Sequence, residues 1–351
     1  MTLTDLRDRV EAALRGFLAD RRAQLTAIDP ELAMLSSAIE GLVLGGGKRL
    51  RPAFAYWGHR AAGGEDSGAV VAAVAALEFL QASALIHDDV IDRSDTRRGE
   101  PAAHRRFAML HAESGWYGDP DGFGDAAAIL LGDACLVWSD ELLHGSGLDP
   151  VTLARARPDF DAMRTEVTAG QYLDVLTQAT GDTSVRRADT VARFKSAKYT
   201  VERPLLLGAA IAGAGPAVRA AYSAFGLPLG VAFQLRDDVL GVFGDPAATG
   251  KPAGDDLREG KRTYLVAASL EGASITDRDR LLKHLGDPKL DEDGVELLRG
   301  ILVRSGGLAR TEDRITALTD AALGALAGAD LDPAGAAALL ELAEASTQRQ
   351  A

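Results

Sequence analysis

Hydrophobic residues recur at helical spacing along nearly the whole of this 351-residue chain. Near the N-terminus, Leu6, Val10, Leu14 and Phe17 repeat at intervals of three and four residues, which marks one face of a helix. Segments rich in Gly, Pro, Asp or Ser separate such stretches, and no convincing strand pattern is present. Three longer stretches carry the same helical stripe: residues 69–92, 160–178 and 221–243. We therefore expect an all-α chain of roughly a dozen helices packed as one large bundle.

Composition favours a single domain that spans residues 1–351. Hydrophobic residues make up 47% of the chain, enough for a large core, and no Pro/Ser-rich linker divides it. A formal net charge of -13 argues against nucleic acid as a partner. The lone Cys135 and a charged N-terminus without a signal-peptide core indicate a cytoplasmic location. The best apolar run, residues 204–218, is too short to span a membrane, so we expect no transmembrane segment and a buried helix there.

Two aspartate clusters each follow a long apolar helical stretch. Asp88, Asp89 and Asp92 lie in LIHDDVIDRSDTRRG, and Asp237 and Asp238 lie in FQLRDDVLGVFGD. Carboxylates at i and i+4 share a helix face and repel one another unless cations neutralise them. Magnesium prefers one or two carboxylates together with waters and phosphate oxygens. The clusters therefore predict a magnesium site for a phosphorylated substrate, although either one alone is more often a solvated helix end.

Basic residues of the kind that bind phosphate accompany these acids. The Gly-rich element is not a nucleotide-binding P-loop, because Leu42 replaces its first Gly and Arg49 replaces its Ser or Thr. Asp255 and Asp256 are expected to cap a helix, and His87 to be a packing or orienting residue. Four elements carry the cations: Lys48, Arg49 and Arg51 in GGGKRLRP, Arg97 and Arg98 in TRRG, Lys195 and Lys198 in FKSAKYT, and Lys251 and Lys261 in KPAGDDLREGK.

The order and spacing of these six elements resemble those of the trans-prenyltransferases, the polyprenyl diphosphate synthases of farnesyl and geranylgeranyl type, over residues 45–261. That family carries GGKRxRP, a first DDxxD followed by RRG, a KT pair, FQxxDD and a late GK pair. The resemblance implies a helical bundle of the isoprenoid synthase type with a central cavity. It also implies Mg²⁺-dependent condensation of isopentenyl diphosphate with an allylic diphosphate, and a homodimer.

Carried over by position, the resemblance assigns roles to individual residues. Isopentenyl diphosphate would be bound by Lys48, Arg51, Gln81 and Arg98. The allylic diphosphate would be bound by Arg97, Lys195, Ser196, Gln234, Lys251 and Lys261. Asp88 and Asp92 would ligate two Mg²⁺ ions and Asp237 a third, with Asp89 and Asp238 in support. The residues expected to act in catalysis are Asp88, Asp92, Lys195, Asp237 and Lys251.

Two positions depart from the family pattern. Gly241 stands where the second aspartate motif has its last Asp, which weakens that site without removing its first Asp, the family's usual ligand. Ser196 replaces the usual Thr and keeps the hydroxyl. A class I terpene cyclase would not need GGGKRLRP or the second aspartate pair, and a non-catalytic subunit of a heteromeric synthase would be expected to lose more of these motifs. Both remain alternatives.

Product length depends on the helix before the first aspartate motif, where one turn rises about 5.4 Å, close to one isoprene unit. Ser83 and Ala84 are small at the turn where farnesyl synthases carry bulk. The product should therefore pass fifteen carbons. Leu80 or Phe79, one turn further away, could close the cavity. This favours geranylgeranyl diphosphate.

Overall fold

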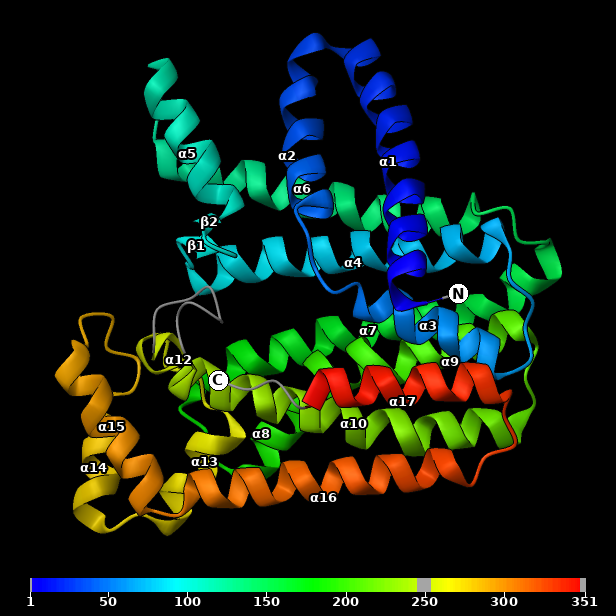
Figure 1. Cartoon of the computed structure of the whole chain (residues 1–351). Helices are drawn as coiled ribbons and strands as arrows, with labels where there is room; N and C mark the ends of the chain where they lie inside the picture. The colour runs from blue at the N-terminus through cyan, green and yellow to red at the C-terminus, as the bar shows by residue number, and fades with distance from the viewer. Residues whose placement is uncertain (1, 245–253, 348–351) are drawn as a thin grey trace.

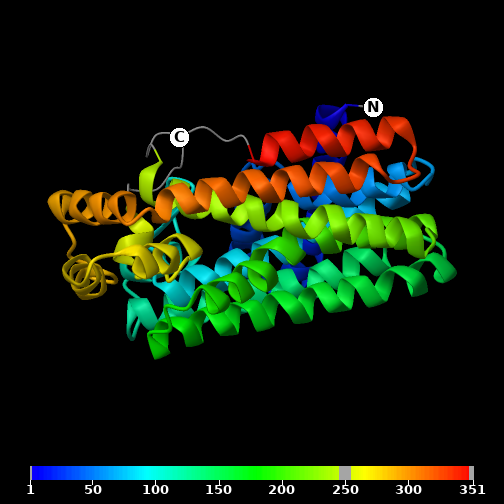
Figure 2. The same cartoon turned by 90° about the horizontal axis from the view of Figure 1, so that it is seen from below.

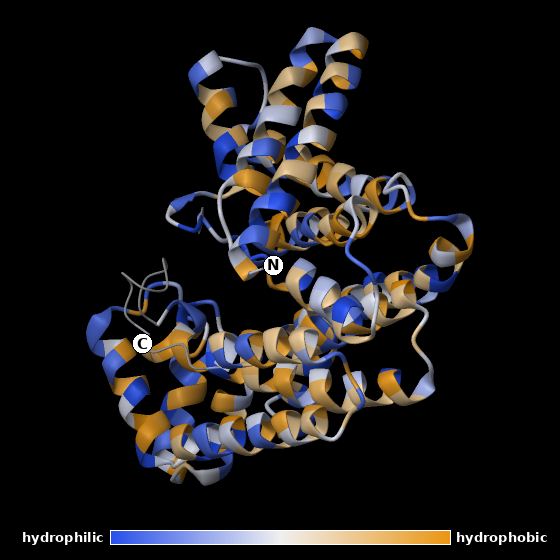
Figure 3. Cartoon of the chain, turned by 45° about the vertical axis from the view of Figure 1, so that its right-hand side comes forward, coloured by the Kyte–Doolittle hydropathy of each residue, from blue (hydrophilic) through white to orange (hydrophobic). Residues whose placement is uncertain are grey.

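The computed structural model describes residues 2–244 and 254–347 and is helical almost throughout. At its centre is α4 (Gly68–Asp92), which packs along α6 (Pro120–His144). Ser67 caps the first turn of α4, and Arg93 ends the helix in a left-handed conformation. The long helices run roughly alongside one another (Figures 1 and 2). In Figure 3, hydrophobic colour gathers along these packed helices, whereas the connecting loops are mostly hydrophilic. The expected all-α bundle is confirmed.

An N-terminal helical hairpin crosses α4 at one side of the bundle (Figure 1). A capping box between Thr2 and Asp5 begins its first helix. The chain then enters the bundle through a Gly-rich turn that ends at Arg49. The elements of this N-terminal part are α1 (Leu3–Ile28), η1 (Pro30–Leu32), α2 (Ala33–Leu44) and α3 (Leu50–Ala61), and α5 (Ala103–Ser114) packs against α6.

The other side of the bundle contains a helical run that changes its geometry part-way. Residues 185–212 are continuous in helical structure, but their middle portion, η2, has π-helical hydrogen bonding. Gly230 allows α10 to approach this wider segment, because a Cβ there would lie 2.6 Å from Ala197 Cα. Such splitting produces more helices than the dozen expected. The elements are α7 (Pro150–Thr180), α8 (Val185–Val191), η2 (Ala192–Glu202), α9 (Arg203–Ala212), α10 (Pro216–Phe243), α16 (Gly307–Ala327) and α17 (Pro333–Thr347).

Short helices close one end of the bundle around a second cluster of buried apolar residues that includes Leu265, Leu298 and Ile301. The two strands β1 (Thr96–Arg97) and β2 (Glu100–Pro101) form a small antiparallel ladder next to the first aspartate motif. No strand was expected there, because two-residue strands leave no periodic pattern. The helices at this end are α12 (Asp255–Arg258), α13 (Tyr264–Gly272), α14 (Ile275–His284) and α15 (Glu292–Arg304).

One helix in the described part of the chain is long and apolar enough to cross a membrane, and it is α4. Its most apolar window has a mean hydropathy of 2.0, and 72% of that window is buried inside the fold. The most apolar stretch is therefore in α4 and not at residues 204–218, where the sequence led us to expect it. Burial of this extent is typical of the core helix of a globular protein.

Candidate active site

A cavity of about 2100 Å³ lies between α4, α7, η2 and α10. Asp92 is not among the residues that line it, and Lys251 lies outside the described residues. Lys198 also turns away, because its Nζ lies 2.6 Å from Glu166 Oε1. The remaining site residues expected from sequence do line the cavity: Lys48, Arg51, Gln81, Asp88, Arg97, Arg98, Lys195, Ser196, Gln234, Asp237 and Lys261.

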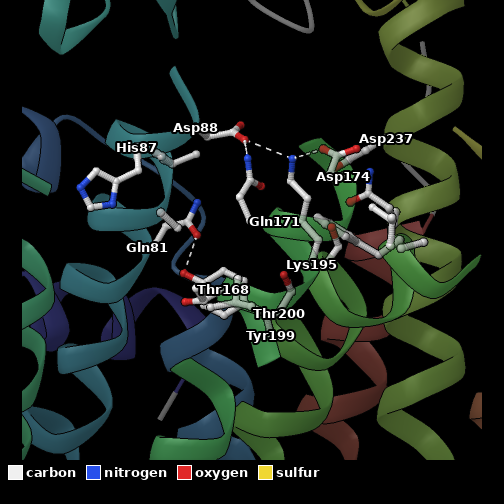
Figure 4. Close-up of a pocket in the computed structure, with 18 of the residues that line it drawn as sticks. Gln81, His87, Asp88, Thr168, Gln171, Asp174, Lys195, Tyr199, Thr200 and Asp237 are labelled. Atoms are coloured by element: carbon white, nitrogen blue, oxygen red, sulfur yellow. Dashed lines mark hydrogen bonds and ion pairs between the residues drawn. The ribbon is translucent and has the colours of Figure 1, made fainter. Parts of the chain in front are cut away.

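Asp88 is the centre of a polar network that joins three helices (Figure 4). Its Oδ1 accepts hydrogen bonds from Gln171 Nε2 at 2.8 Å and from Lys195 Nζ at 3.1 Å. Lys195 Nζ also donates to Asp174 Oδ2 at 2.6 Å. Burial opposes ionisation of Asp88, but the charges of Lys195 and Lys261 outweigh it and lower the pKa. Burial likewise opposes the charge of Lys195, yet Asp88 and Asp174 raise its pKa, so the ammonium is retained at neutral pH.

Asp92 lies one turn beyond Asp88 in a different environment. Burial and the neighbouring Asp88 charge raise the pKa of Asp92 to about 6. Its Oδ2 has no hydrogen-bond partner, and Lys261 Nζ is 3.8 Å away. The intervening Asp89 instead accepts a hydrogen bond from Arg97 Nε at 3.0 Å. A buried, unsatisfied carboxylate oxygen beside a second carboxylate fits a bound cation.

The described residues contain no group of three or more His, Cys, Asp or Glu side chains gathered closely enough to hold a metal ion by themselves. This arrangement still fits magnesium, which takes one or two carboxylates and completes its shell with waters and substrate phosphates. It does not fit a metal that requires a complete cage of protein ligands.

Both aspartates of the second motif line the cavity, and Asp238 is the more buried of the two. Asp237 lines the cavity and is drawn beside Asp174 in Figure 4. Asp238 is buried and accepts a hydrogen bond from Gln234 Nε2 at 2.7 Å. Burial, then the Asp256 and Asp237 charges, raise the pKa of Asp238 to about 8. Asp238 is therefore largely protonated at neutral pH.

Asp256 does not cap a helix as expected. The N-cap of α12 is Gly254, with no side-chain capping bond. The Asp256 carboxylate instead occupies the space beside Gly241, where an added Cβ would clash with Asp256 Oδ2. Asp256 Oδ1 also lies 3.6 Å from Lys261 Nζ. The absence of a side chain at Gly241 therefore leaves the space that the Asp256 carboxylate occupies.

Across the cavity, η2 supports two residues of the expected isopentenyl diphosphate site. The Tyr199 hydroxyl donates to Gln81 Oε1 at 2.9 Å (Figure 4). The Arg51 guanidinium stacks over the Tyr199 ring at 4.2 Å and donates to Thr200 Oγ1 at 2.9 Å. The middle of this helical run has the i to i+5 bonding of a π-helix, and Lys195, Tyr199 and Thr200 of this segment all line the cavity.

Sequence reasoning missed several polar cavity residues, among them Gln171, Asp174, Tyr199 and Thr200. Gln171 and Asp174 are spaced i and i+3 on α7, so both lie on one face of the helix. This i, i+3 spacing is the sequence signal that could have identified Gln171 and Asp174. His87 also lines the cavity, and it packs against α6 as expected, since its Nε2 donates to Ile129 O at 3.2 Å.

The apolar part of the cavity lies on the upstream turns of α4. Leu80, Ser83 and Ala84 all line it. Phe79 is fully buried on another face of α4, with its ring centroid 5.2 Å from Phe17 and 5.9 Å from Trp138. Of the two residues expected to close the cavity, Leu80 therefore faces it, whereas Phe79 belongs to an aromatic cluster behind it.

Comparison with known proteins agrees with this geometry. The sequence model of the polyprenyl synthetase family matches residues 32–301. A geranylfarnesyl diphosphate synthase from Aeropyrum pernix is 34% identical over 80% of this chain and 83% of its own length. A (2E,6E)-farnesyl diphosphate synthase from Mycobacterium bovis is 31% identical over 74% of this chain and 68% of its own. A crystal structure of geranylgeranyl pyrophosphate synthase from Corynebacterium glutamicum, complexed with isoprenyl diphosphate and magnesium, matches with a TM-score of 0.97 and 42% identity over all of both chains.

Proposed function

The chain belongs to the polyprenyl synthetase family, and we propose that it condenses isopentenyl diphosphate with an allylic diphosphate to form geranylgeranyl diphosphate. One observation carries the proposal. A single cavity is lined by the cations of the Gly-rich segment with Arg98, by a second set that comprises Arg97, Lys195 and Lys261, and by Asp88 and Asp237. Two diphosphates would need such a division.

Magnesium is the cofactor that we propose for this site. Asp88 and Asp92 would hold two ions and Asp237 a third, with the remaining positions filled by water and diphosphate oxygens. The unsatisfied Oδ2 of Asp92 supports this assignment. When bound, the ions neutralise the diphosphate leaving group.

The protein's own residues would act on each substrate in turn. Lys195 and Lys261 would bind and stabilise the departing allylic diphosphate, together with Arg97, Ser196, Gln234 and Lys251. Their charges favour cleavage to an allylic carbocation. The double bond of isopentenyl diphosphate would then attack the cation, and a proton would leave to the released diphosphate. Ser83, Ala84 and Leu80 would exclude water that could otherwise quench the cation.

Product length follows from the same apolar lining. Ser83, Ala84 and Leu80 line the cavity. The small Ser83 and Ala84 would leave room beside the aspartates, and Leu80 would narrow the cavity one turn further along α4. This supports a twenty-carbon product. Relatives named for farnesyl and geranylfarnesyl products also match, so the family alone does not fix the length.

We further propose a cytoplasmic homodimer whose subunits are each one domain over residues 1–351. The match over all of both chains with one solved synthase supports the single domain. On α6, the exposed fractions of Ile129, Leu130 and Val137 are 47%, 62% and 62%. An apolar stripe of this kind on a helix beside the cavity supports association with a second copy. Light scattering of the purified protein tests this proposal, and a stable monomer would contradict it.

The function is tested by incubating the purified chain with Mg²⁺, isopentenyl diphosphate and either dimethylallyl, geranyl or farnesyl diphosphate. Mass spectrometry of the products should give geranylgeranyl diphosphate as the main species. Cyclised hydrocarbon would indicate a terpene cyclase instead. Absence of any product from all three primers would favour a non-catalytic subunit.

A further inference from the structure

The three cations of the Gly-rich segment differ in burial. Lys48 is exposed and Arg51 is partly buried, and both line the cavity. Arg49, between them, has a side chain that is only 4% exposed and is ion-paired with Glu78 of α4. Arg49 Nη2 also donates to Val43 O at 2.7 Å. Arg49 also lines the cavity, but its guanidinium is committed to protein contacts.

The backbone at Arg49 is held in an unfavourable conformation. Its φ of 51° and ψ of 39° are left-handed, although the residue is not glycine. A non-glycine residue remains in this region only where the surrounding structure fixes it. Arg49 is the N-cap of α3, so this conformation sets the angle at which the chain enters the helix that carries Arg51. The contacts with Glu78 and Val43 O hold the Arg49 side chain at this entry.

Glu78 connects this segment to the rest of the site. It lies on α4, three residues before Gln81 and ten before Asp88, and it lines the cavity itself. Burial lowers the pKa of Arg98, and the Glu78 charge counteracts that effect. Arg98 Nη1 in turn donates to Gly46 O at 2.9 Å. Glu78 therefore contacts the Gly-rich segment directly through Arg49. It also stabilises the charge of Arg98, which is hydrogen-bonded to Gly46 of the same segment.

We propose that the buried Arg49–Glu78 pair positions Lys48 and Arg51 for isopentenyl diphosphate and is not itself a ligand of either substrate. This inference rests on the proposed function of the site. Without the pair, the left-handed turn would relax, and Lys48 and Arg51 would lose their fixed placement relative to Gln81. Misplacement by about 1 Å can reduce the efficiency of a site by about 100-fold.

The test compares Glu78→Gln with the double variant Arg49→Met/Glu78→Leu. The single change can impair folding, because it leaves the buried guanidinium with only Glu11, 3.7 Å from Arg49 Nη2, as a counter-charge. The double change removes both partners and replaces them with apolar groups, which restores much of the stability. Asp159→Asn is the matched control, since Asp159 is an equally buried carboxylate that Arg219 contacts at 2.9 Å, away from the cavity lining.

Calorimetric titration with isopentenyl diphosphate alone, which cannot react without an allylic partner, measures the affected site directly. The dissociation constant should rise at least about tenfold in both Arg49–Glu78 variants and remain unchanged in Asp159→Asn. The Michaelis constant for the allylic substrate should stay within about twofold of wild type. A folded double variant with wild-type affinity for isopentenyl diphosphate would overturn the inference alone. Failure of the wild-type chain to bind isopentenyl diphosphate or form product would overturn the proposed function and the inference with it.

Discussion

Removing the charge of Asp88 or of Asp92 should change stability in opposite directions, although the two residues are one turn apart on α4. Asp88 accepts hydrogen bonds from Gln171 and Lys195, and its pKa is lowered despite burial. Asp92 has a side chain that is 6% exposed, and burial and Asp88 raise its pKa to about 6 from an ordinary value of 3.8. One carboxylate is thus stabilised in the folded state, and the other is destabilised.

The size of the Asp92 effect follows from this difference. Each tenfold change in an acid constant corresponds to about 1.4 kcal/mol, so ionised Asp92 costs the folded state up to about 3 kcal/mol. The sign is set by a folded pKa above the unfolded one: stability falls as pH rises from about 4 to about 6, and the cost is complete above that. Asp92→Asn should therefore raise the free energy of unfolding by up to about 3 kcal/mol at about pH 8, and by almost nothing at about pH 4. For a chain of this length, that is about 4 °C in Tm.

Asp88→Asn should behave in the opposite way. Its lowered pKa contributes stability that is present above an ordinary value of 3.8 and is lost on acidification. Both variants should lose turnover by orders of magnitude. Differential scanning calorimetry without metal at about pH 4 and about pH 8 measures the stability of each variant, and Mg²⁺ with inorganic diphosphate should then raise Tm in wild type but not in Asp92→Asn. Equal destabilisation by the two substitutions at about pH 8 would refute the reasoning.

Three further outcomes are expected. Ala84→Phe should shorten the main product toward fifteen carbons and Leu80→Ala should lengthen it, as read by product mass; an unchanged product from the active Phe variant would remove Ala84 from the path of the growing chain. Lys48→Ala should mainly raise the Michaelis constant for isopentenyl diphosphate, whereas Lys195→Ala should mainly slow ionisation of the allylic substrate; pre-steady-state kinetics separate the two, and identical effects would contradict the division of sites. Gly230→Ala should destabilise the fold by about 1–3 kcal/mol in chemical denaturation, because its Cβ would press on η2, and unaltered stability would contradict the close packing described.

The helices could be predicted from the sequence because hydrophobic residues recur along the face of each helix that is buried. Residues 69–92, 160–178 and 221–243 fall within α4, α7 and α10. The sequence also predicted most of the charged cavity lining, because phosphate and metal chemistry demands particular side chains at recognisable spacings. Both the hydrophobic stripes and the motif spacings lie within short segments, so they can be recognised in a single sequence.

What the sequence could not predict depends on packing between distant segments. The i to i+5 bonding of η2 leaves no local signature, so Tyr199 and Thr200 were not expected to share the cavity with Lys195. The direction of Asp256 depends on free space beside Gly241, on another helix. Similarly, three neighbouring cations look alike in sequence, and only the left-handed turn distinguishes the buried Arg49 from the others.

The π-helical segment has a consequence for changes in chain length. An α-helix advances about 100° per residue, so losing one residue within 192–202 could restore α-helical bonding while rotating every later side chain by about a quarter turn. The contacts of Tyr199 with Gln81 and Arg51 would then be broken even though each amino acid remained present. The relative position of the two diphosphate sites thus depends on the number of residues in this segment as well as on their identity. Natural or engineered variants should accept substitutions here far more readily than insertions or deletions.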